Sequence, residues 1–142
     1  MAEKPETRFA RNVHKYVQPE LPENLDDVIH MEHTNNPVRS GTPDFYIEGP
    51  GNLIWVEYKF IKIPWTTSKA PHQICNTKSW THQLKWLNRS HRHGVQTATI
   101  VGFTKNRVSF GYILRHPFAF DPEKHKPIPV KDIGAWINSM VT

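Results

Sequence analysis

The nine residues LIWVEYKFI, at positions 53–61, predict a largely buried β-strand, because only Glu57 and Lys59 among them are charged. Successive side chains of a strand point to opposite faces, so Val56 and Tyr58 share one face and Glu57 and Lys59 share the other. A charge in a buried strand needs a partner, a metal ion or a chemical task. The pair is therefore the first candidate for a functional site.

A second strand-like segment, SGTPDFYIEG at positions 40–49, is joined to the first by a short turn containing Pro, Gly and Asn. A hairpin of the two segments would bring Asp44 close to Glu57 and Lys59. Such a group of carboxylates and an ammonium is what a metal-dependent phosphodiester-cleaving site needs. The alternative is that Lys59 only forms a salt bridge with Glu57 or Asp44.

The remaining segments carry helical and strand patterns on both sides of this hairpin. We expect a first strand at 27–33, and Asp132 is a candidate cap for a last helix. Residues 61–79 lack periodicity and predict an insertion loop. Apolar spacing predicts helices over 5–17 and 80–93, and alternation predicts a hairpin or adjacent strands at 95–103 and 108–114.

Two polar residues on the expected helices are further candidates. Glu6 lies on the core-facing stripe of the first helix, although the helix dipole alone favours an acid at an N-terminus. Gln83 lies on the second helix, where by itself it would be an ordinary polar position. His30 and His33 lie close together, but without the spacing of a recognisable zinc motif.

The run Gly41-Thr42-Pro43-Asp44, the triplet Glu57-Tyr58-Lys59 and the later Gln83 resemble, in this order, the motifs of the PD-(D/E)xK nuclease superfamily. Within that superfamily they are most similar to the VRR-NUC group, which is related to Holliday junction resolvases. The resemblance covers roughly residues 6–103. It implies a restriction-endonuclease-like core of α/β (α+β) class, with a mixed β-sheet flanked by helices.

The resemblance also implies roles for these residues. Asp44, Glu57 and the main-chain carbonyl of Tyr58 would bind Mg²⁺ or Mn²⁺, and Glu6 would complete the acidic cluster or hold a second ion. Lys59 would orient the attacking water and stabilise developing negative charge. Three carboxylates this close repel one another, so at least one pKa should be raised without metal.

The resemblance implies that Gln83 forms a hydrogen bond with Lys59 or with a metal-bound water molecule. The long insertion at 61–79 departs from compact relatives, and this departure puts the equivalence of Gln83 in question. The insertion itself is a candidate for a flap that grips the substrate.

Length and charge are consistent with a DNA-binding enzyme of one domain, with a core at about 5–114, the insertion at 61–79 and a C-terminal extension at 115–142 that contains a helix. The net charge of +5 favours a polyanionic partner. No apolar stretch could span a membrane, and the single cysteine fits a cytoplasmic, reducing setting. Candidate DNA contacts are Arg39, Lys62, Lys69, Lys78, Arg89 and Arg92.

The expected function is that of a metal-dependent endonuclease acting on branched, flapped or junction DNA, and a small chain of this kind is typical of a phage or mobile-element nuclease. A homodimer would supply the two sites needed to cut both strands of a symmetric junction. Two alternatives stay open: a catalytically silent DNA-binding or anti-defence module on the same fold, and a site-specific restriction-type endonuclease.

Overall fold

The computed structural model describes residues 3–34, 43–61, 78–121 and 123–142, without the side chains of 78–80. In these ranges a six-stranded mixed sheet has the order β1-β2-β3-β4-β5-β6, in which only β3 and β4 run parallel. The elements are α1 (Pro5–His14), β1 (His30–His33), β2 (Phe45–Glu48), β3 (Leu53–Phe60), α3 (Lys78–Arg92), β4 (Gln96–Lys105), β5 (Val108–Leu114), β6 (Ile128–Pro129) and α4 (Val130–Val141).

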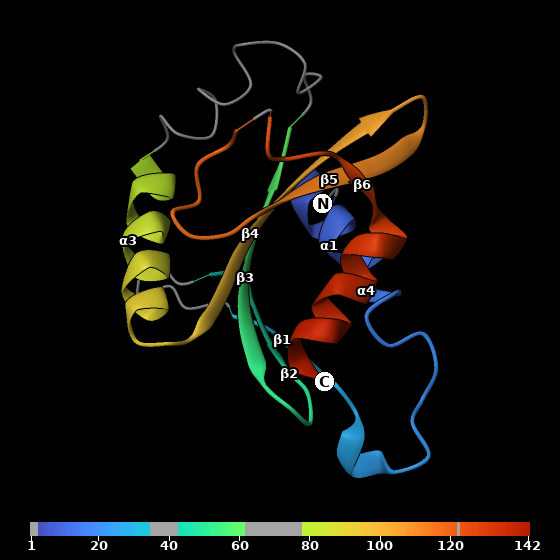
Figure 1. The fold of residues 1–142 in the computed structure, drawn as a ribbon. Coiled ribbons are helices and arrows are strands. Elements are labelled where there is room, and N and C mark those ends of the chain that lie inside the picture. Colours follow the sequence, from blue (N-terminus) through green and yellow to red (C-terminus); the bar gives the residue numbers. More distant parts are fainter. Residues whose placement is uncertain (1–2, 35–42, 62–77, 122) are drawn as a thin grey trace.

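The helices cover the sheet from both sides (Figure 1). Helix α3 lies on one side and forms the crossover that a parallel pair of strands requires. Helices α1 and α4 lie on the other side, against β3 and β5. The described chain is therefore a mixed α/β structure with a sheet flanked by three helices, as the sequence predicts.

The main core lies between the sheet and the pair α1 and α4. Val56 and Tyr58 both point into it, which confirms that they share a face of β3. Close packing at this face needs a glycine: a Cβ on Gly102 of β4 would lie 2.6 Å from the ring of Phe9. Helix α3 packs with a smaller cluster on the opposite face, which includes Leu87.

The C-terminal helix belongs to the same core and is not a peripheral extension. Ile133, Ile137 and Val141 of α4 are fully buried against α1 and the sheet. The Val141 carbonyl accepts hydrogen bonds from the backbone N–H groups of Gly51 and Asn52, at 2.9 and 3.1 Å. Helix α4 therefore holds the turn between β2 and β3.

The boundaries of the elements differ from the sequence-based expectation most clearly at α1, β1 and α4. Helix α1 ends at His14, and Val17 is reached by a tighter i→i+3 turn that still buries it. Strand β1 begins only at His30, because Leu25–Asp27 form a 3₁₀ turn capped by the side chain of Asn24. Our prediction for Asp132 is wrong: it lies within the first turn of α4, and Pro129 occupies the N-cap position without a side-chain cap.

None of the helices in the described ranges has the length and apolar character needed to cross a membrane. The predicted insertion at 61–79 falls almost wholly outside the described residues.

Candidate active site

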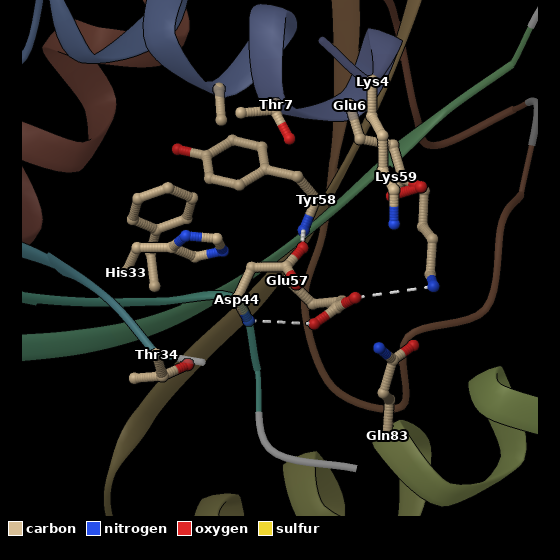
Figure 2. A pocket seen from close by; sticks show the side chains of 12 residues that line it. Lys4, Glu6, Thr7, His33, Thr34, Asp44, Glu57, Tyr58, Lys59 and Gln83 are labelled. Atoms are coloured by element: carbon tan, nitrogen blue, oxygen red, sulfur yellow. Dashed lines mark hydrogen bonds and ion pairs between the residues drawn. The ribbon is translucent and has the colours of Figure 1, made fainter. Parts of the chain in front are cut away.

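A pocket of about 340 Å³ opens at the ends of β2 and β3, between α1 and α3 (Figure 2). Its position follows from the hairpin, which pairs Phe45 with Val56 and so places Asp44 beside Glu57. The pocket is lined by Lys4, Glu6, Thr7, Ala10, His33, Thr34, Asp44, Phe45, Glu57, Tyr58, Lys59 and Gln83. All five predicted catalytic residues, Glu6, Asp44, Glu57, Lys59 and Gln83, therefore line one cavity.

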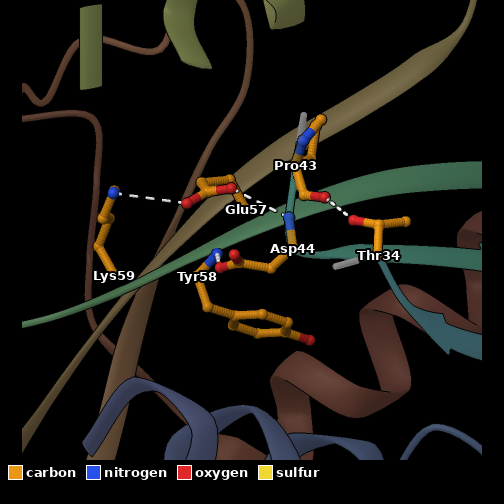
Figure 3. A network of polar contacts seen from close by, with 6 residues as sticks. All are labelled: Thr34, Pro43, Asp44, Glu57, Tyr58 and Lys59. Atoms are coloured by element: carbon orange, nitrogen blue, oxygen red, sulfur yellow. Dashed lines mark hydrogen bonds and ion pairs between the residues drawn. The ribbon is translucent and has the colours of Figure 1, made fainter. Parts of the chain in front are cut away.

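The carboxylates of the hairpin are held by backbone N–H groups (Figure 3). The Asp44 N–H donates to Glu57 Oε2 at 3.0 Å, and the Tyr58 N–H donates to Asp44 Oδ2 at 3.1 Å. Each strand thus fixes the acid of its neighbour. These two hydrogen bonds fix the relative positions of the two carboxylates.

Lys59 lies on the Glu57 side of the pocket. Its Nζ is 3.4 Å from Glu57 Oε1, and its side chain is 17% exposed, against 1% for Glu57. The close contact that such a salt bridge requires is therefore present, and it becomes an ion pair when Glu57 is ionised. It does not exclude a catalytic role, because the ammonium still borders the pocket.

Burial disfavours the charged forms of the acids that line this pocket. It raises the pKa of Glu57 to about 9, with a further increase from the charge of Asp44 and an opposing effect from Lys59. Burial also raises the pKa of Asp44 and that of Glu6, and Lys59 opposes both shifts. The predicted pKa increase is confirmed, but loss of hydration contributes more to it than the repulsion between carboxylates that we expected.

The acidic side chains that line the pocket fit a hard divalent cation, because all of them offer oxygen. A cation would also compensate the charge that burial now disfavours. However, no three His, Cys, Asp or Glu side chains in the described part of the chain are gathered in a metal-holding arrangement. In this geometry Asp44 and Glu57 use one oxygen each to accept an N–H.

Gln83 reaches the pocket from α3, across from the hairpin (Figure 2). Its Oε1 atom is buried and has no hydrogen-bond partner. The long insertion before α3 therefore does not displace this residue from the site. An unsatisfied buried oxygen facing a polar pocket is suited to accept a hydrogen bond from a ligand or a water molecule.

The predicted DNA contacts remain predictions. Arg89 and Arg92 are exposed on α3, outside the pocket lining, and the Arg89 guanidinium lies 5.9 Å from the ring centre of Trp86. Arg39, Lys62 and Lys69 lie outside the described residues, as does the side chain of Lys78.

Two histidines near the site were not recognised from the sequence as site residues. His33 lines the pocket because β1 pairs it with Phe45, next to Asp44. His14 lies on the same helical stripe as Ala10, and its Nε2 is 2.8 Å from the Tyr58 hydroxyl. Burial lowers the pKa of His14 to about 4, so its ring is neutral at pH 7. This bond connects α1, which carries Glu6, to the strand that carries Glu57.

In comparisons with known proteins, no protein-family model matches the chain, and no curated protein is significantly similar to it.

Proposed function

We propose that the protein is a Mg²⁺- or Mn²⁺-dependent deoxyribonuclease with a restriction-endonuclease-like core. One observation carries the proposal: Asp44, Glu57, Lys59, Glu6 and Gln83 come from three separate parts of the chain and line a single pocket. They are the residues that the ordered resemblance to PD-(D/E)xK nucleases selects. Carboxylates in a cavity whose pKa values are raised by loss of hydration are also typical of functional sites.

The acids would hold the ion and the amine would act on the phosphate. Asp44, Glu57 and the Tyr58 carbonyl would bind the cation, with Glu6 as an additional ligand. A bound divalent cation supplies charge neutralisation at the phosphate and lowers the pKa of water. Lys59 would orient the attacking water and stabilise the negative charge that develops on the phosphate.

The preferred substrate in this proposal is branched, flapped or junction DNA, cut endonucleolytically. The preference rests on the resemblance to junction-resolving enzymes and on the net charge of +5. Cutting both strands of a symmetric junction would require a homodimer. A phage origin and a cytoplasmic location complete this proposal.

A catalytically silent DNA-binding module is the second candidate. The observation that favours it is that Asp44 and Glu57 each use a carboxylate oxygen to accept a backbone N–H. The two candidates differ in one measurable property, which is metal-dependent cleavage.

The test incubates the protein with four-way-junction, flapped, linear duplex and supercoiled DNA, each with Mg²⁺, Mn²⁺, Ca²⁺ or EDTA. Lys59→Ala should reduce cleavage by about 100-fold or more. The matched control is Lys131→Ala, which removes an exposed lysine at the start of α4 and should leave cleavage unchanged. Wild-type protein that binds DNA but cuts none of these substrates with Mg²⁺ or Mn²⁺ would exclude the nuclease and favour the binding module.

A further inference from the structure

His33 has a fixed position at the edge of the pocket. It is the last residue of β1, and its exposed ring stacks on Phe45 with a centroid distance of 4.8 Å and an interplanar angle of 18°. Phe45 is itself held edge-on by His14 and Tyr58, at 4.5 and 5.5 Å. The orientation of the His33 imidazole is therefore fixed by its stacking on Phe45, which is itself packed against two further rings.

The imidazole of His33 is directed into the pocket on the Asp44 side (Figure 2). Lys59 lies on the other side of the two acids, next to Glu57. The neighbouring Thr34 hydroxyl donates to the Pro43 carbonyl, so its hydrogen is already used. His33 thus offers an N–H group on the flank opposite Lys59.

Hydrolysis of a phosphodiester by in-line displacement needs help on two opposite sides of the phosphorus atom. Water attacks on one side, and the sugar oxygen departs on the other. A phosphate placed over Asp44 and Glu57 would have Lys59 on one flank and His33 on the other. The arrangement of donors in the pocket matches these two requirements.

We propose that His33 is a further catalytic residue, which donates a hydrogen bond from its imidazole to the leaving oxygen of the scissile phosphate. This role rests on the proposed nuclease function. In the step, the water oxygen bonds to phosphorus and the bond from phosphorus to the sugar oxygen breaks, with its electron pair going to that oxygen. His33 stabilises the charge on this oxygen, which then takes a proton from solvent, and the proton of the attacking water leaves to a second water molecule.

The test compares two versions of the same cleavage site. The ends produced by the wild type are mapped first, to identify whether the 3′ or the 5′ sugar oxygen departs. The second substrate then carries sulfur in place of that oxygen. A thiolate is a stable leaving group and a weak hydrogen-bond acceptor, so it needs little help from a donor.

The variants are His33→Ala, His33→Gln and the control His30→Ala. His30 lies on the same strand, is exposed and does not line the pocket. On the oxygen substrate, His33→Ala should be slower by about 100-fold and His33→Gln by less, since an amide N–H can partly replace the imidazole. On the sulfur substrate, His33→Ala should lose less than about 5-fold, and His30→Ala should match the wild type on both substrates.

Two measurements do not depend on turnover. The affinity for uncleaved DNA in Ca²⁺ should change by less than about 3-fold in His33→Ala, because the bond forms chiefly in the transition state. The ¹⁵N resonances of the His33 ring should still shift when DNA binds, because the phosphate then lies beside the ring before the bond to the leaving oxygen forms, and those of His30 should not; unshifted His33 resonances would overturn the role.

An equal loss on the oxygen and sulfur substrates, or wild-type rates in His33→Ala, would overturn the role of His33 while the nuclease function stands. Absence of metal-dependent cleavage by the wild type would overturn the proposed function and this role with it.

Discussion

Replacing Glu57 by glutamine should stabilise the protein at neutral pH when no divalent cation is present. The carboxyl is 1% exposed, and burial with the charge of Asp44 raises its pKa from 4.5 to about 9. The folded state therefore binds this proton more tightly than the unfolded chain does. Stability from this group is complete below about pH 4.5 and is lost as the pH rises toward 9. Glutamine has a similar shape and no proton to lose.

The magnitude follows from the size of the pKa shift. Each pH unit between 4.5 and 9 lowers the free energy of unfolding by about 1.4 kcal/mol, so the loss at pH 7 is about 3 kcal/mol. Glutamine recovers only part of it, because its NH₂ group must face either the Asp44 N–H or the Lys59 ammonium. One lost hydrogen bond costs about 1 kcal/mol. We therefore expect Glu57→Gln to be more stable than the wild type by about 2 kcal/mol at pH 7.

The assay is urea unfolding in EDTA between about pH 5 and pH 8. The difference between Glu57→Gln and the wild type should grow by about 1.4 kcal/mol per pH unit. Glu20→Gln, which changes an exposed carboxylate between α1 and β1, is the control and should follow the wild type. A difference that stays constant over this range would show that Glu57 does not titrate as its burial requires, and the electrostatic account of the site would be wrong.

Three further predictions concern packing, acid stability and the metal ion. The pKa of His14 is lowered from 6.5 to about 4, so the unfolded chain binds a proton here more tightly than the folded protein does. Between pH 7 and pH 5 the free energy of unfolding of the wild type should therefore fall by about 2 kcal/mol relative to that of His14→Gln. A difference between the two proteins that does not change with pH in urea unfolding would contradict this. Gly102→Ala should destabilise the fold by about 2 kcal/mol through contact with Phe9, and Phe9→Leu should recover part of that loss, whereas additive effects would refute the contact. Binding of Mg²⁺ at pH 7 should release about one proton, mainly from Glu57, so heats that are equal in buffers of different ionisation enthalpy would argue against Glu57 as a ligand.

The hairpin could be predicted from the sequence because the pattern that determines it lies within one short stretch of the chain. Alternation places Val56 and Tyr58 on one face, and the turn before Leu53 fixes the pairing of 45–48 with 53–56. The start of β1 was missed for a local reason as well: the side chain of Asn24 accepts the Asp26 N–H and stabilises a turn where an extended chain was expected.

The rest of the site depends on contacts between distant segments. Asp44 and Glu57 belong to one hairpin, whereas Glu6 and Gln83 reach the pocket only through the packing of α1 and α3. Apolar spacing indicates which face of each helix is buried, but it does not predict how close Glu6 and Gln83 come to the acids of the hairpin. The place of His33 depends on the register of β1 against β2, and four residues with no clear alternation do not predict a register.

The cost of burying Glu57 has a consequence for the role of the C-terminal helix. A loss of about 3 kcal/mol is a large fraction of the 5–15 kcal/mol that stabilise a typical domain, so the β2–β3 hairpin needs support from outside. Helix α4 supplies it: the Val141 carbonyl binds the turn at Gly51 and Asn52, and Gln96 Nε2 donates to the carbonyls of Leu53 and Met140 at 2.9 and 2.7 Å. Both contacts hold the opposite end of the hairpin from the acids. Strand β3 is thus fixed at its first residue, Leu53, and these contacts offset the cost of the buried carboxylate of Glu57 farther along the strand.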